Sequence, residues 1–141
     1  MKLPTWLLPA LQSQQETRPS SNPDTRMRIF NLTRQTHLAR SAEVAASGAK
    51  RTKGLLGRKG LAPGEGMWIV PCEAVHTFGM QFSLDLVYLD RKHRVRKVRS
   101  NVVPWRISAC LTAHSILELP SGTIRESQTQ IGDLIEFSSG P

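Results

Sequence analysis

Short apolar runs, separated by polar segments rich in glycine and proline, recur from about residue 27 to residue 138. The spacing predicts strands over residues 28–32, 38–46, 67–70, 84–89, 94–99, 114–119 and 134–137. In the run 84–89, alternation with a period of two places Leu84, Leu86 and Tyr88 on one face and Asp85, Val87 and Leu89 on the other. Val95 and Val98 are three residues apart, which indicates a bulge or an exposed edge in the strand 94–99.

Two stretches have helical signals. Ser47 can cap a short helix over residues 48–56, which Gly57 would end. Thr123 and Glu126 have the spacing of a capping box for a single helical turn. We therefore predict a compact, mainly β (α+β) domain, a mostly antiparallel barrel or sandwich with one short helix and a helical turn.

The domain organisation follows from where the periodic pattern begins. Residues 1–26 hold four of the nine prolines and no periodic apolar pattern, which predicts a disordered tail followed by one β-rich domain over residues 27–138. The hydrophobic content of 39% suffices for a core, and no run is long enough to span a membrane. The apolar N-terminus is broken by prolines and lacks a cleavage site, so we expect a cytoplasmic protein.

The net charge of +8 has a local origin. From Met27 onward there are 16 basic and 9 acidic residues, and removing seven basic residues of one stretch leaves 9 of each. That basic patch consists of Arg91, Lys92, Arg94, Arg96, Lys97, Arg99 and Arg106. It can attract phosphate, anionic lipid or an acidic partner, or keep an edge strand from aggregating. We do not expect nucleic-acid binding, because aromatic residues for stacking are scarce there.

A polar segment from Cys72 to Asp85 carries the candidate chemistry. A carboxylate on an apolar face needs a partner, and His76 and Thr77 are the nearest donors to Asp85. Glu118, between two leucines, is a second such carboxylate. The predicted hub, either a ligand site or a structural hydrogen-bonding centre, consists of Cys72, His76, Thr77, Asp85 and Glu118.

Nearby residues allow three other interpretations. Cys72, His76 and Asp85 could form a nucleophilic arrangement, but no strained turn accompanies the cysteine. The matched spacings from Cys72 to His76 and from Cys110 to His114 could supply zinc ligands, yet residues four apart on a strand lie ~13 Å apart. We therefore predict neither a metal site nor a cofactor. A tryptophan at position 105 is expected to plug one end of the barrel, with a ligand platform as the alternative.

Several motifs together resemble one prokaryotic family, domain of unknown function 192. They are, in order, Gly54-Leu-Leu-Gly-Arg58, Gly66-Met-Trp-Ile69, Pro71-Cys72, His76-Thr-Phe-x-Met-x-Phe-x-Leu-Asp85, Leu89-Asp90, Leu117-Glu-Leu-Pro-x-Gly122 and Gly132-Asp133. The resemblance covers residues 27–137 and implies a single-domain β fold without an established reaction. The sequence departs from the family pattern at Ser83 and at residues 91–93.

These observations favour a non-catalytic binding or accessory domain with a small polar ligand pocket, whose partner is a small ligand or an acidic molecule. A Cys/His-dependent hydrolase or transferase is the first alternative, and a basic-patch binder of nucleic acid or another anion is the second.

Overall fold

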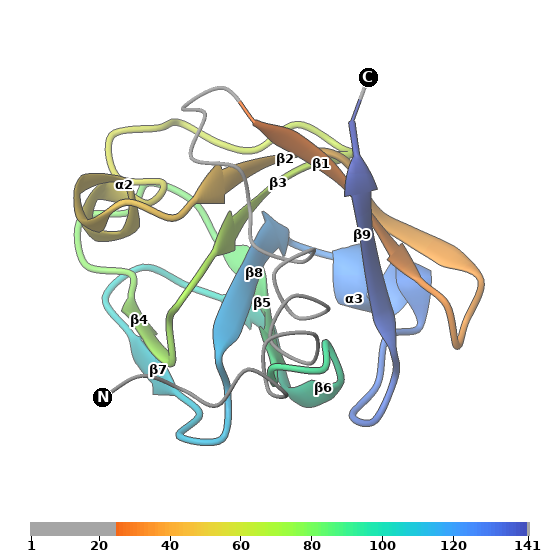
Figure 1. Ribbon diagram of the computed structural model, residues 1–141. Coiled ribbons are helices and arrows are strands. Elements are labelled where there is room, and N and C mark those ends of the chain that lie inside the picture. Colours follow the sequence, from red (N-terminus) through yellow and green to blue (C-terminus); the bar gives the residue numbers. More distant parts are fainter. Residues whose placement is uncertain (1–24, 141) are drawn as a thin grey trace, which may run out of the picture.

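The computed structural model describes residues 25–140, and it forms a curled sheet that encloses one core (Figure 1). The strands are β1 (Arg26–Asn31), β2 (Thr36–Ala45), β3 (Glu65–Ile69), β4 (Ala74–His76), β5 (Leu84–Leu89), β6 (Val95–Val102), β7 (Ile107–Ala109), β8 (Ser115–Pro120) and β9 (Ile135–Ser139). The two helices are α2 (Gly48–Lys53) and α3 (Thr123–Ser127). The predicted tail lies outside the described residues except at its last two positions, and Arg26 already belongs to β1.

Seven strands form the main sheet in the order β6-β5-β8-β3-β2-β1-β9, and β4 and β7 form a separate two-stranded ribbon. All pairs are antiparallel except β2 with β3. The outer strands β6 and β9 approach each other at one end. There the backbones of Arg94 and Leu134 form an isolated antiparallel β-bridge, and the amide of Val95 donates a hydrogen bond to the carbonyl of Asp133. The sheet is therefore a half-barrel whose two edge strands are joined by hydrogen bonds at that end. The predicted mainly β, mostly antiparallel fold is confirmed.

The concave face of the sheet holds the larger core. Alternate residues of each strand point inward, among them Trp68, Val87 and Leu117, and Ile124 of α3 packs against them. Figure 1 shows α3 within the curve of the sheet. The predicted capping box is wrong: the Thr123 hydroxyl donates to the carbonyl of Pro120, and no side chain of α3's own N-terminus caps it. The buried Asp85 performs that role instead.

The convex face carries a second apolar cluster, which includes Met67, Leu86 and Tyr88. The ribbon β4–β7 and the segment that follows α2 cover this cluster, since Val75 and Leu55 pack against it. Ser47 caps α2 by accepting a hydrogen bond from the amide of Lys50, as predicted, although the helix ends at Lys53. The two faces of β5 follow the predicted alternation, because its alternate residues belong to the concave and the convex cluster. Both faces of the sheet therefore pack against apolar side chains.

Strand β6 lies at the edge of the main sheet and has an irregular register against β5, as its valine spacing predicted. Its basic side chains are exposed along most of its length. Across the described residues, no helix is both long and apolar enough to cross a lipid bilayer.

Candidate ligand-binding site

Asp85 is fully buried on the concave face of β5, and each of its carboxylate oxygens accepts backbone hydrogen bonds. Oδ1 accepts from the amide of Asn101 at 2.8 Å. Oδ2 accepts from the amides of Gly122 at 3.2 Å and Ile124 at 2.8 Å. The carboxylate thus joins β6 to the start of α3, and both of its oxygens are engaged within the protein.

Thr77 is also buried, and it fixes the turn between β6 and β7. Its hydroxyl donates to the carbonyl of Val103 at 2.8 Å and accepts from the amide of Arg106 at 2.9 Å. Its backbone amide donates to the Arg106 carbonyl at 2.8 Å. The Thr77 hydroxyl and amide therefore bond to this turn, and neither bonds to Asp85.

His76 is exposed and makes an aromatic contact instead of an ion pair. Its ring lies 5.2 Å from that of Phe78, which in turn stacks on Trp105 at 5.7 Å. Trp105 is 67% exposed, so the prediction that it plugs the barrel is wrong. The turn that Thr77 holds carries this tryptophan on the outside of the ribbon, with a left-handed backbone conformation (φ 65°).

Glu118 projects from β8 into the convex cluster, on the side of the sheet opposite to Asp85. Its Oε2 is buried and has no hydrogen-bond partner among the described residues, and it would lie 3.8 Å from a methyl group added at Gly54. Burial raises the pKa of Glu118 to about 7, and the charge of Arg58 offsets only part of that rise. The five hub residues therefore do not converge on one site, although Cys72 packs against the same convex cluster as Glu118.

Cys72 lies between β3 and β4, where its thiol donates to the carbonyl of Ala74 at 3.1 Å. Burial raises the pKa of Cys72, although the Ala74 contact opposes the rise. Since His76 and Asp85 have other partners, the three side chains do not form the nucleophile-base-acid arrangement considered above. Among residues 25–140, no three metal-ligating side chains converge, and the Cys110 sulfur lies 3.4 Å from the Thr112 hydroxyl.

We expect Cys72 to react slowly with iodoacetamide at neutral pH, because only the thiolate is nucleophilic and burial disfavours it. In a Cys110→Ser background, the labelling rate should rise by about tenfold per pH unit without levelling near neutrality. Mass spectrometry of the Cys72 peptide measures this rate. A plateau below neutral pH would instead indicate an activated nucleophile.

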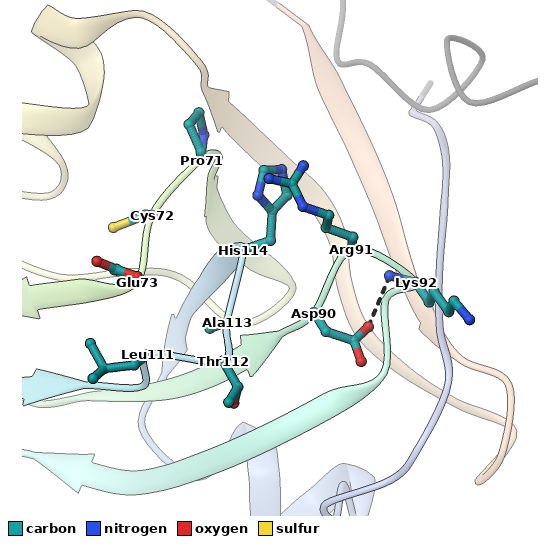
Figure 2. A pocket seen from close by; sticks show the side chains of 10 residues that line it. All are labelled: Pro71, Cys72, Glu73, Asp90, Arg91, Lys92, Leu111, Thr112, Ala113 and His114. Atoms are coloured by element: carbon teal, nitrogen blue, oxygen red, sulfur yellow. Dashed lines mark hydrogen bonds between the residues drawn. The ribbon is translucent and has the colours of Figure 1, made fainter. Parts of the chain in front are cut away.

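An open cavity of about 700 Å³ lies at the end of the sheet where three connecting segments meet. Figure 2 shows these segments, which follow β3, β5 and β7. The lining residues are Pro71, Cys72, Glu73, Asp90, Arg91, Lys92, Leu111, Thr112, Ala113 and His114. Backbone bonds hold the segments together: Cys72 donates to the His114 carbonyl at 2.8 Å, and His114 donates to that of Leu89 at 2.7 Å.

The acidic residue Asp90 at this cavity forms hydrogen bonds within the protein, whereas the two neighbouring basic residues form no ion pair among the described residues. Asp90 Oδ1 accepts from the amides of Lys92 at 2.9 Å and Arg94 at 3.0 Å, and its Oδ2 lies 4.0 Å from Arg96. Arg91 and Lys92, in contrast, form no ion pair within the described part of the chain. Burial lowers the pKa of His114, and the charge of Arg91 lowers it further, so the imidazole is neutral at physiological pH.

The structure divides the predicted basic patch into three parts. Arg91 and Lys92 line the cavity, while Arg94, Arg96 and Arg99 lie exposed along β6 and the strand's entry. Lys97 points toward the ribbon, where its ammonium donates to the Ala109 carbonyl at 2.7 Å. Arg106 lies in the connection between β6 and β7, directly before β7. The patch is therefore a set of neighbouring but separate surfaces.

Sequence reasoning missed Glu73, Asp90 and Thr112 as cavity residues and considered His114 only as a metal ligand. Asp90 follows a predicted strand, which is a place where polar site residues gather, but nothing in the sequence brings position 90 to positions 73 and 112. The pairing of β5 with β8 brings position 90 to the segment before β8, and the backbone bonds of Cys72 to His114 and of Cys110 to Glu73 bring position 73 there.

The fold defines a half-barrel β domain with a small attached ribbon. The family model for domain of unknown function 192, described as an uncharacterised ACR, matches residues 30–137. The chain belongs to that family, as its motifs indicated.

Two solved structures have a similar fold. One is a candidate transcription regulator from Sinorhizobium meliloti 1021, with 23% identity and a TM-score of 0.70 over 80% of this chain and 92% of that one. The other is a protein of unknown function from Novosphingobium aromaticivorans, with 20% identity and a TM-score of 0.68 over 88% and 96%. None of the curated proteins compared with this chain matches it. At these identities the likeness concerns the fold alone.

Proposed function

We propose that this protein is a non-catalytic binding domain that takes a small anionic ligand, bearing a carboxylate or phosphate group, in the cavity beside Arg91. The observation that carries the proposal is the pair of unpaired cations, Arg91 and Lys92, at the rim of an open cavity. A guanidinium can bind a carboxylate or a phosphate through two parallel hydrogen bonds.

The size and lining of the cavity support a small ligand. Its volume of about 700 Å³ lies within the ~300–1,000 Å³ of typical ligand pockets. The Thr112 hydroxyl and the His114 imidazole add uncharged polar groups, and Leu111 and Pro71 supply apolar surface. A mixture of this kind suits a ligand with an anionic group and a short apolar body.

The acidic residues of the cavity do not oppose an anion strongly. Asp90 is engaged with two backbone amides, and in Figure 2 the Glu73 carboxylate points away from Arg91 and His114. The side chains of Arg91 and His114 lie on the same side of the cavity, where they can contact one anionic group together.

Replacing Arg91 tests this proposal. We expect inorganic phosphate and succinate to raise the thermal midpoint of the wild-type protein, because a ligand that binds the folded state stabilises it. The rise should be lost in Arg91→Ala and retained in Arg28→Ala, which removes the same charge from an exposed position of β1. Differential scanning fluorimetry measures the shift.

Two results would contradict the proposal. Either both anions leave the wild-type midpoint unchanged, or they shift it equally in Arg91→Ala. The uncharged additive glycerol at the same concentration separates a specific shift from a general solvent effect.

A further inference from the structure

The ribbon formed by β4 and β7 has an exposed apolar outer face. Residues at alternate positions point to this side, and we call His76, Phe78, Trp105 and Ile107 the ribbon face. Phe78 is 40% exposed, Trp105 67% and Ile107 69%. Leu111, which is 83% exposed, continues the apolar surface as far as the cavity.

An apolar surface of this kind needs an explanation beyond the fold. Val75 and Ser108 already face the convex core, so the outward residues contribute little to the packing of the ribbon. The ribbon face and Leu111 together expose roughly several hundred Å² of apolar area, and surface patches of this size commonly mark binding sites. A tryptophan with a neighbouring arginine is also typical of interaction hot spots.

Positive charge flanks the ribbon face on the side of β6. Lys97 and Arg99 are paired with Tyr88 and Leu86, so they rise from the same sheet face that the ribbon covers. Arg106 lies between two residues of the ribbon face, and neither Arg99 nor Arg106 forms an ion pair with any described carboxylate. A partner that covers the apolar residues would therefore gain from carrying acidic groups at its border.

The free edge of β4 distinguishes a protein partner from a lipid surface. The register of β4 against β7 follows from two backbone bonds, from Thr77 to Arg106 and from Cys110 to Glu73. In this register the N–H and C=O groups of His76 point away from β7. Neither group has a hydrogen-bond partner within residues 25–140. Hydrocarbon would leave them unsatisfied, whereas a peptide partner leaves them accessible to water or bonds them.

The aliphatic residues distinguish a protein partner from a nucleic acid. Bases stack on aromatic rings, and one face of the Phe78 and Trp105 pair is already used in their mutual contact. Ile107 and Leu111 have the largest exposed fractions of the surface, and neither offers a stacking plane.

We propose that the ribbon face binds an acidic peptide segment of a partner protein, whose apolar side chains cover Trp105 and Ile107. The acidic side chains of the segment lie toward Arg99 and Arg106. This site borders the cavity at Leu111 but does not include Arg91 or Lys92.

The test begins with selection of random dodecapeptides on phage against the full-length protein. We expect the selected sequences to combine Asp or Glu with apolar residues. Synthetic versions should bind Ile107→Ser about tenfold more weakly than wild type, by fluorescence anisotropy. Ile131→Ser is the matched control, because Ile131 is 67% exposed in the loop before β9, and its affinity should stay within about twofold of wild type.

Charge is tested separately, since Arg99→Glu should weaken binding and Arg28→Glu should not. The proposal is overturned if no peptide is enriched, or if the enriched peptides bind Ile107→Ser as well as wild type. It is also overturned if phosphatidylglycerol vesicles or oligothymidylate, and not peptides, show binding that Ile107→Ser abolishes. Peptides sensitive to Arg91→Ala alone would overturn this proposal while leaving the cavity proposal standing.

Discussion

Asp85→Ala is expected to destabilise the protein by on the order of 4 kcal/mol, because three backbone amides lose a buried acceptor together. The amides of Gly122 and Ile124 belong to the start of α3, and that of Asn101 belongs to β6. Without the carboxylate, α3 has no cap, since its own N-terminal residue supplies none. Urea denaturation followed by circular dichroism measures the change in the free energy of unfolding.

Asp90 offers a matched comparison within the same chain. It also accepts two backbone hydrogen bonds through one carboxylate oxygen, but it is partly exposed. Water can replace it, so Asp90→Ala should cost only about 1 kcal/mol. Asp85→Asn, which keeps one acceptor oxygen, should fall between the two alanine variants. Equal effects of Asp85→Ala and Asp90→Ala would show that burial does not determine the cost.

The second large effect concerns Glu118 and pH. Between its ordinary pKa of 4.5 and its folded pKa of about 7, the folded state holds a proton that the unfolded state has lost. Stability contributed by this group is therefore present below that window, decreases as the pH rises through it, and reaches its lowest value above about pH 7. The difference amounts to about 3 kcal/mol, at ~1.4 kcal/mol per pKa unit.

Glu118→Gln isolates this contribution, because the amide does not ionise. The variant should gain stability relative to wild type as the pH rises from about 5 to about 8. The quantity to compare is the difference in unfolding free energy between wild type and Glu118→Gln at each pH, because other groups also make stability depend on pH. His93 and His114 have lowered pKa values, and their contribution rises with pH up to about 6.5, opposite in sign to that of Glu118. A pH-independent difference between the proteins would refute the buried, protonated carboxyl.

The sequence allowed the placement of Asp85 to be predicted but not its partners. Strict alternation along residues 84–89 put the carboxylate on the inward face, and the structure confirms this orientation. Its bonds reach residues 16 to 39 positions away, which depends on how α3 and β6 return to β5. The nearest donors in the sequence, His76 and Thr77, are instead held by the ribbon, because Pro71 and the following residues lead the chain out of the main sheet.

Glu118 shows a similar division between local pattern and tertiary contact. Its leucine neighbours indicated burial correctly, yet alternation on β8 sends it to the convex side while Asp85 points to the concave side. The ribbon face could have been recognised in part, since Trp105, Ile107 and Leu111 alternate through the segment. What the pattern could not reveal is that this apolar side faces solvent, because a two-stranded ribbon covers the core with its other side.

The pairing of β1 with β9 has a practical consequence for any study of the molecule. The amide of Gly140 donates to the carbonyl of Arg26 at 3.0 Å, so the two ends of the described chain are neighbours. Figure 1 places them on the side of the molecule away from β4 and β7. An affinity tag, a fluorophore or an anchoring linker attached after the C-terminal strand β9 therefore lies on this side, and the protein can be immobilised with both the cavity and the ribbon face turned toward the solution.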